Sequence, residues 1–328
     1  MIITRTPFRV SFFGGGLDYP SWYNTNGGKV IGTTIDKYCY ISIRDLPPFF
    51  KHKYRIVYSS IENVKTINEI NHPSVREVLK YLNISNGLEI HHDGDLPARS
   101  GLGSSSSFTV GLINALRAYQ GNFSSKEYLA KTAIDIEQNK IEECVGSQDQ
   151  NHVAHGGLNL IEFTEKNFVV KPLILSESTR EALENSCLLF FTGVCREAQT
   201  IAKEQVKNIN KNHSHLHKMA EFTDEALSLL RCDDIKNFGL LLDENWKYKK
   251  SLASNISLDI IDNAIGLAKQ NGAMSGKILG AGGGGFLLIF SEPCHHQKII
   301  ESLNHIVHVP FSFEHEGSKI IFYEQRGN

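Results

Sequence analysis

The chain has 328 residues, of which 41% are hydrophobic and 21% charged, and its formal net charge at pH 7 is −2. A chain of this length is expected to form two domains, because single hydrophobic cores stop growing at roughly 250–300 residues. The near-neutral charge excludes a general electrostatic attraction to nucleic acid or to an anionic membrane. These values favour a protein that acts on a small neutral or anionic molecule.

The first ten residues, MIITRTPFRV, lack the basic and apolar regions of a secretion signal, and no run approaches the roughly 18 apolar residues of a membrane span. Six cysteines are scattered without a C-x-x-C pair, which favours reduced thiols over a disulfide framework or a zinc site. We therefore expect a cytoplasmic protein without a membrane partner.

In chain order, the first third is predicted to form strands over residues 30–43, 55–58 and 89–92. A helix is predicted to begin at the serine cluster 104–107 and to end near Gly121. Residues 124–127 read as a capping box that opens a second helix, which runs to about residue 141 and carries Glu137.

The second half is predicted to be richer in helix. Residues 188–191 resemble a buried strand, and the closing elements are predicted as a strand pair within 277–289, a helix over 296–305, and strands at 307–313 and 319–323. Between them we expect helices over 196–230, 234–250 and 258–270. We place a domain boundary near residue 180, which gives domains 1–180 and 181–328.

Residues 95–107, DLPARSGLGSSSS, form the most informative segment. Glycines and small hydroxyl residues directly before a helix expose backbone N–H groups to an anion, and such a helix start binds phosphate. The segment lacks the G-x-x-x-x-G-K-[ST] pattern, so it is no Walker A loop. A flexible linker is the alternative, although an apolar helix follows it directly.

Residues 277–286, KILGAGGGGF, contain a formal G-x-G-x-x-G pattern. A dinucleotide fingerprint should open a helix, whereas the apolar run that follows here reads as a strand. A glycine turn between strands allows close approach of a ligand or another loop, and a purely structural hairpin is an equal alternative.

Two further segments carry charged side chains suited to chemistry. A predicted strand that contains Arg9 ends in the glycine turn 14–16 and presents Asp18, which can bind sugar hydroxyls or simply form an Asx turn with its own backbone. Asp149 lies in a predicted loop, twelve residues after Glu137. Phosphoryl transfer requires a metal ligand, a cation and often such a carboxylate near the acceptor hydroxyl.

Together and in this order, P-x-R-x-x-x-x-G-G, G-L-G-S-S and G-A-G-G-G-G resemble the motifs of the GHMP kinase superfamily over residues 5–290. The resemblance implies an α+β fold. Its N-terminal α+β domain contains a left-handed βαβ unit, its C-terminal domain is ferredoxin-like, and the active site lies between them.

The resemblance also implies ATP and Mg²⁺. Asp149 matches a catalytic aspartate and Arg9 a cation near the transferred phosphoryl group, while Glu137 and Ser105, or equally Ser104, match the Mg²⁺ ligands. The residues implied to surround the ATP phosphates are Arg99, Ser100, Gly101, Leu102, Gly103, Ser104, Ser105, Ser106 and Ser107.

Within the superfamily, G-G-G-x-D-x-P, D-K-Y and V-G-S-Q-D-Q resemble the kinases that phosphorylate the anomeric hydroxyl of a heptose 7-phosphate. Leu17 stands where those enzymes are expected to have threonine, and fucose kinases share several of the motifs. The residues implied to bind the substrate are Gly15, Gly16, Asp18, Gly283, Gly284 and Arg196. Arg196 is a candidate for the phosphate of the acceptor, with Lys29 and Arg99 as alternatives.

Two non-enzymatic hypotheses are weaker. A sugar or nucleotide sensor would not need Arg9, Glu137 and Asp149 together. A metal site at His213, His215 and His217 is unfavourable because i, i+2, i+4 spacing on a helix does not place all three on one face. The expected partners are a sugar phosphate and ATP, and the expected assembly is a monomer or homodimer.

Overall fold

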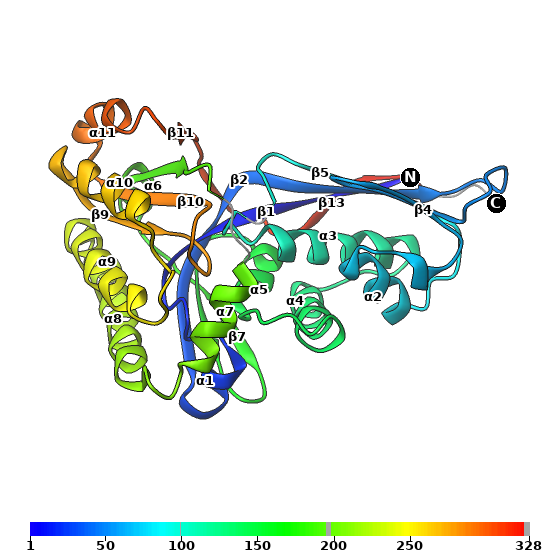
Figure 1. Ribbon diagram of the computed structural model, residues 1–328, viewed down its shortest axis with the longest axis horizontal. Coiled ribbons are helices and arrows are strands. Elements are labelled where there is room, and N and C mark those ends of the chain that lie inside the picture. The colour runs from blue at the N-terminus through cyan, green and yellow to red at the C-terminus, as the bar shows by residue number, and fades with distance from the viewer. Residues whose placement is uncertain (99, 195–197, 325–328) are drawn as a thin grey trace.

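The computed structural model describes residues 1–98, 100–194 and 198–324, and the chain forms two sheets (Figure 1). In the described residues the larger sheet has nine strands, with β13, β1, β2, β5, β3 and β4 in order. β6 and β12 also pair with β2, and β7 pairs with β6. Its strands are β1 (Ile2–Phe13), β2 (Gly28–Asp45), β3 (Tyr54–Val57), β4 (Ile61–Val64), β5 (Leu88–Gly94), β6 (Asn159–Phe163), β7 (Phe168–Pro172), β12 (Phe313–Glu314) and β13 (Lys319–Tyr323).

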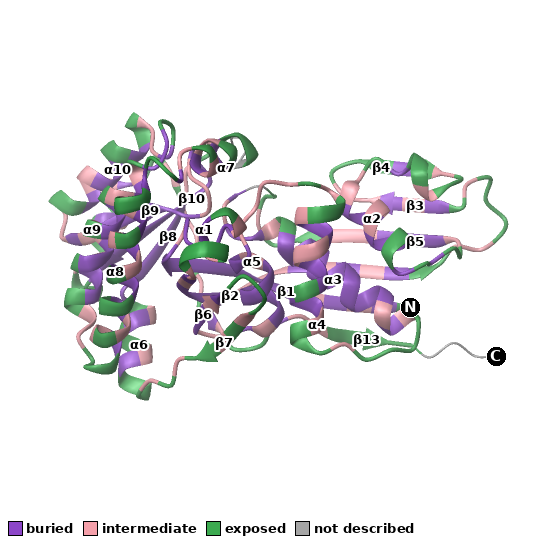
Figure 2. Cartoon of the chain, turned by 90° about the horizontal axis from the view of Figure 1, so that it is seen from below, coloured by how far each residue is buried: buried purple, intermediate pink, exposed green. Residues whose placement is uncertain are grey.

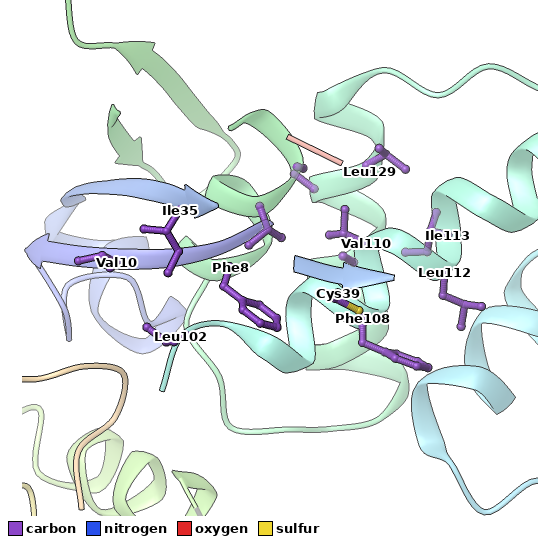
Figure 3. Close-up of a cluster of buried hydrophobic side chains, with 14 of the residues drawn as sticks. Phe8, Val10, Ile35, Cys39, Leu102, Phe108, Val110, Leu112, Ile113 and Leu129 are labelled. Carbon is purple, nitrogen blue, oxygen red and sulfur yellow. The ribbon is translucent and has the colours of Figure 1, made fainter. Parts of the chain in front are cut away.

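The helices α2 (Pro73–Tyr81), α3 (Ser104–Tyr119), α4 (Lys126–Asp135) and α5 (Gln148–His155) lie on one side of the long strands in Figure 1. The core forms where α3 packs against β1 and β2, because α3 is apolar on nearly every face and is therefore buried. Figure 3 shows Phe8 of β1 and Val110 of α3 within one cluster of buried apolar side chains. β3 and β5 pair in parallel across α2, as expected for a βαβ unit, and its left-handedness stays a prediction.

The smaller sheet contains β8 (Cys187–Phe191), β9 (Ala273–Ile278), β10 (Phe286–Ser291) and β11 (Val307–His308), in the order β11-β8-β10-β9. The neighbouring strands pair antiparallel, and the helices follow β8 and β10, which is the βαββαβ arrangement of a ferredoxin-like domain. Figure 2 shows these strands buried behind the more exposed α8 (His213–Arg231), α9 (Ile235–Lys250) and α10 (Asp259–Gln270). The expected C-terminal fold is confirmed.

Further helices complete the described part of the chain. They are α1 (Pro20–Asn26), α6 (Glu177–Asn185), α7 (Ala198–Lys207) and α11 (His296–Ser302), with 3-10 turns at Ile67–Glu69 and Pro293–His295. Trp22 of α1 is 1% exposed, and its ring centroid lies 5.2 Å from that of His213 and 5.1 Å from that of His217. These histidines therefore contribute to packing between α1 and α8.

The C-terminal strands return to the larger sheet. β13 pairs antiparallel with β1, and β12 pairs with β2, so residues 313–323 lie with the first part of the chain. The division into 1–180 and 181–328 stays a prediction, but these two strands are structurally part of the N-terminal sheet. Among the described residues, no helix is long and apolar enough to cross a membrane.

Candidate active site

A cavity of about 280 Å³ lies between loops of the two parts of the chain. Its walls come from β1, the glycine turn 14–16, the start of α3, the turn that follows α4, residues 143–150, α7, α9 and the turn at residues 280–281. The sequence segments that carry candidate chemistry therefore meet at one place, although they are far apart in the chain.

The loop before α3 has the geometry of an anion site. Gly101 and Gly103 have φ angles of 82° and 74°, which glycine adopts without steric penalty. Helix α3 begins directly afterwards at Ser104, and the first backbone N–H groups of a helix have no partner within it. These groups and the helix dipole favour a phosphate at this end of the cavity.

The glycine turn 280–285 of the smaller sheet packs backbone to backbone against this loop. The Phe286 N–H donates to the Ser100 carbonyl at 3.0 Å. A Cβ on Gly101 would lie 2.4 Å from the Leu279 oxygen, and a Cβ on Gly285 would lie 2.2 Å from the Ser100 oxygen. Because these positions have no side chains, the backbones of the two loops can pack in direct contact. This contact joins the two parts of the chain at the cavity.

Arg9 and Asp149 form a bidentate pair in the cavity. The Arg9 Nε and Nη2 donate to Oδ1 and Oδ2 of Asp149, each at 2.9 Å. Arg9 is 2% exposed and also donates to the Gly101 carbonyl, so its guanidinium joins the catalytic candidate to the loop before α3. Two parallel hydrogen bonds from one guanidinium fix the orientation of the carboxylate.

Asp149 lies in the first turn of α5, not in a loop as the sequence suggested. A carboxylate is favoured at this position by the helix dipole. Burial, the largest influence, raises the pKa of Asp149, Arg9 lowers it, and Asp18 raises it. The carboxylate is therefore held between a cation and a second carboxylate at the cavity wall.

Glu137 is buried, at 1% exposure, in a π-helical turn (Ile136–Lys140) that follows α4. Its Oε2 accepts from Ser106 Oγ at 3.0 Å and from Gln150 Nε2, whereas Oε1 has no partner among the described residues. Burial raises the pKa of Glu137 to about 7. Buried, incompletely bonded carboxylate oxygens and neighbouring hydroxyls are the hard oxygen ligands that Mg²⁺ prefers.

Asp18 closes the glycine turn of β1. Its Oδ1 accepts from the Gly16 N–H at 3.0 Å, and its Oδ2 accepts from Gln148 Nε2 at 3.0 Å. The bond to its own backbone is that of the simple turn considered from the sequence. Asp18 nevertheless lines the cavity, as do Gly15 and Gly16.

Lys277 of β9 is a second buried cation beside this turn. It is 6% exposed, and its Nζ donates to the carbonyls of Ser11 at 2.9 Å and Phe12 at 2.7 Å. Burial, together with Lys249 and Arg9, lowers its pKa to about 7. Lys277 thereby connects the smaller sheet to the end of β1.

The Lys277 pKa predicts a pH-dependent stability. The folded value of about 7 lies below the ordinary value of 10.5, so between these two pH values the unfolded chain binds more protons, and stability rises with pH. Between pH 7 and pH 9 the unfolding free energy of the wild type should rise by about 2 kcal/mol more than that of Lys277→Met. Urea unfolding at each pH measures this difference. Lys236→Met, at an exposed position, should show the same pH dependence of unfolding free energy as the wild type. If the difference in unfolding free energy between Lys277→Met and wild type did not change with pH, the lowered pKa of Lys277 would be contradicted.

The structure brings most of the candidate site residues together. Those that line the cavity are Arg9, Gly15, Gly16, Asp18, Gly101, Gly103, Ser104, Ser105, Ser106, Glu137 and Asp149. Arg99 and Arg196 lie outside the described residues. All roles assigned to individual residues stay predictions.

Five of the candidates are not among the residues that line the cavity. Leu102 is fully buried in the core, and Ser107 donates to the Pro7 carbonyl at 2.8 Å, so both position the loop. Gly283 donates to the Ile256 carbonyl at 2.9 Å. The remaining two, Ser100 and Gly284, pack against the opposite glycine turn and Val194 respectively.

Sequence reasoning missed several cavity residues. Gln148 and Gln150, which flank Asp149, bond to the carboxylates of Asp18 and Glu137, and their position in V-G-S-Q-D-Q was the available signal. Lys249 and its partner Gln205 come from helices of the smaller part, where no motif distinguishes them from surface residues.

Two family profiles match the chain. The GHMP kinases N terminal domain matches residues 69–157, and the GHMP kinases C terminal profile matches residues 226–306. A D-glycero-alpha-D-manno-heptose 7-phosphate kinase from Campylobacter jejuni is 30% identical, over 97% of this chain and 98% of that protein. The chain belongs to the GHMP kinases. This GHMP kinase is therefore a phosphotransferase, as the motifs implied.

Other relatives agree with this assignment. An L-fucokinase/L-fucose-1-P guanylyltransferase from Bacteroides fragilis is 26% identical over 88% of this GHMP kinase, which spans only 34% of that protein. The crystal structure of a D-glycero-D-manno-heptose 1-phosphate kinase from Bacteroides thetaiotaomicron has a TM-score of 0.78 at 23% identity, covering 99% of this chain and all of that one. This likeness confirms the two-domain α+β fold.

Proposed function

We propose that this GHMP kinase is a cytoplasmic sugar kinase that transfers the γ-phosphoryl group of ATP to the anomeric hydroxyl of D-glycero-D-manno-heptose 7-phosphate. The product would be the 1,7-bisphosphate, for nucleotide-activated heptose synthesis. The observation that carries the kinase chemistry is the Arg9–Asp149 pair, which faces the start of α3 in one cavity. The acceptor is supported by the motif pattern and by the Campylobacter jejuni relative.

Each group in the cavity has its own role in the proposed phosphoryl transfer. The N–H groups at the start of α3 bind the phosphates of ATP, and the Asp149 carboxylate accepts the proton of the acceptor hydroxyl. The hydroxyl oxygen bonds to the γ-phosphorus as the bond to ADP breaks. Arg9 orients Asp149 and neutralises charge near the transferred group.

The Glu137 region fits a Mg²⁺ ion. Glu137 offers a buried, unpartnered oxygen, and Ser105 and Ser106 of the α3 start line the same cavity. When bound there, Mg²⁺ would neutralise negative charge on the ATP phosphates. Ser105 remains the proposed hydroxyl ligand, and the hydrogen bond from Ser106 to Glu137 makes Ser106 a further candidate.

Replacing Glu137 by Gln should raise the Mg²⁺ concentration needed for half-maximal rate by about 10- to 100-fold, because a carboxylate ligand becomes a neutral amide. The measurement is a Mg²⁺ titration of initial rate at saturating ATP. Glu165→Gln, at an exposed turn outside the cavity, is the matched control and should leave the titration unchanged. An unaltered Mg²⁺ dependence in Glu137→Gln would remove Glu137 from the proposed ligand set.

The test of the function is ADP formation by the purified protein with ATP and Mg²⁺. The acceptors are D-glycero-D-manno-heptose 7-phosphate, L-fucose, D-galactose and D-mannose, with a reaction lacking acceptor as blank. We expect rapid turnover with the heptose phosphate alone, and a product phosphorylated at the anomeric carbon by ³¹P NMR.

Other outcomes select the alternatives. Turnover of fucose but not of the heptose phosphate would retain the sugar kinase and replace the acceptor, in line with the fucokinase relative. Binding of ATP without turnover of any acceptor would favour a sensor over an enzyme.

A further inference from the structure

Lys249, at the end of α9, brings a buried ammonium group to the cavity from the smaller part of the molecule. Its side chain is 6% exposed, and its Nζ donates to Gln205 Oε1 of α7 at 2.6 Å. Within the described residues, no carboxylate oxygen lies within 4.0 Å of this Nζ. An ammonium group has three N–H donors, so its single neutral partner leaves hydrogen-bonding capacity for a ligand.

The surroundings of Lys249 are open toward the glycine turn of β1. A Cβ built on Gly16 would lie 3.5 Å from the Lys249 Nζ, and one built on Gly15 would lie 4.0 Å from it. Lys249, Gly15 and Gly16 all line the main cavity, so the ammonium borders the space that a ligand would fill. Gln205 is held in turn by its Nε2, which donates to the Ala281 carbonyl at 2.8 Å.

Three basic side chains, Arg9, Lys249 and Lys277, lie near the end of β1. Lys249 and Arg9 both lower the pKa of Lys277, and Asp149 is already paired with Arg9. Asp18, Glu137 and Glu143 also line the cavity. Asp18 accepts from Gly16 and Gln148, and Glu137 accepts from Ser106 and Gln150. A buried cation without an ionic partner is unfavourable, and a bound anion would relieve this cost.

Lys249 also borders a second, smaller cavity that the loop before α3 does not line. Besides the main cavity, Lys249 lines a small adjoining cavity of about 20 Å³ with Ser11, Gly15 and Lys277, and none of residues 100–107 lines it. Lys249 therefore reaches the main cavity from the side of the glycine turn that carries Asp18.

We propose that Lys249, positioned by Gln205 and facing the glycine turn at residues 15–16, binds the phosphate group of a sugar phosphate acceptor. This inference rests on the proposed function and assigns the second phosphate pocket to α9 and α7 instead of to Arg196. Burial lowers the pKa of Lys249 to about 8 while Asp18 raises it, and an adjacent phosphate dianion would favour the charged amine further.

The test compares Lys249→Met with Lys250→Met, which removes the neighbouring lysine that is partly exposed and paired with Asp262. The two acceptors are D-glycero-D-manno-heptose 7-phosphate and the same heptose without phosphate. In Lys249→Met, KM for the heptose phosphate should rise about 10- to 100-fold, because a charge-assisted contact is lost. KM for the unphosphorylated heptose, KM for ATP and kcat should stay within about twofold of wild type, and Lys250→Met should match wild type throughout.

The same comparison is made by calorimetry of heptose 7-phosphate binding without ATP, where the dissociation constant should rise by a similar factor in Lys249→Met. If Lys249→Met does not fold, as judged by circular dichroism, Gln205→Met replaces it. Gln205→Met removes only the amide that positions the amine and should raise the same KM by a smaller factor.

The outcomes separate this inference from the proposed function. Wild-type turnover of the heptose phosphate with equal losses for both heptoses in Lys249→Met would overturn the phosphate assignment alone. A wild type that prefers the unphosphorylated heptose would also overturn it. A wild type that neither binds nor phosphorylates heptose 7-phosphate but turns over fucose would overturn the proposed acceptor and the inference together.

Discussion

Asp149→Asn is expected to lower kcat by about 10²- to 10⁴-fold, because an amide cannot accept the acceptor proton. The dissociation constant for ATP should change by less than about threefold, since the start of α3 and not Asp149 binds the phosphates in our proposal. Asparagine keeps the size of the side chain and can still accept one hydrogen bond from Arg9. The measurement combines steady-state rates with equilibrium ATP binding.

The matched control is Asp93→Asn, at an exposed position of β5 outside the cavity, and it should retain wild-type turnover. A loss of less than about tenfold in Asp149→Asn would remove the role of proton acceptor from this residue. A parallel loss of ATP affinity would instead indicate that Asp149 supports the loop before α3 through Arg9.

Gly285→Ala is expected to lower the unfolding free energy by about 3 kcal/mol or more and to reduce activity. The φ angle of Gly285 is 89°, and an added Cβ would lie 2.2 Å from the Ser100 carbonyl oxygen. The substitution must therefore separate the glycine turn from the loop before α3, and it also introduces backbone strain. Thermal unfolding and urea titration measure the loss.

The matched control is Gly266→Ala in α10, where an added Cβ meets no atom within 4 Å. That variant should be more stable than wild type by roughly 0.5–1 kcal/mol, because alanine is favoured over glycine inside a helix. If Gly285→Ala were as stable as Gly266→Ala, the two loops would not be interlocked as the structure shows.

The glycine segments were the most predictable part of the molecule. Their turns follow from local chemistry, since positive φ angles such as those of Gly101 and Gly103 favour glycine and a helix start favours small polar residues. The helix of 104–119 and the strand pair around 280–285 are confirmed for the same reason. Arg9, Glu137 and Asp149 could be proposed because their positions match those of functional residues in the GHMP kinases.

The acceptor side of the site could not be predicted in this way. Lys249 reaches the cavity only because α9 packs against the smaller sheet and turns one of several terminal lysines inward. Its neighbour Lys250 is one position along the same sequence and is paired at the surface. Nothing local distinguishes the two, so burial depends on tertiary packing.

The return of β12 and β13 was also invisible in the sequence. An exposed strand such as Lys319–Tyr323 shows its own β propensity but not its partner, which here is β1, more than three hundred residues earlier. The π-helical turn at Glu137 is a similar case, because its pattern differs from an ordinary helix end only in the register of its hydrogen bonds.

The return of the chain to its first sheet makes the smaller domain an insertion with two covalent connections. One runs from Pro172 to Cys187 and the other from His308 to Phe313. Any opening of the cavity to admit or release a ligand must bend both connections together, which restricts the halves to a shared hinge axis and opposes independent twisting. A protein cut at residue 180 would consequently lack β13, which pairs with β1.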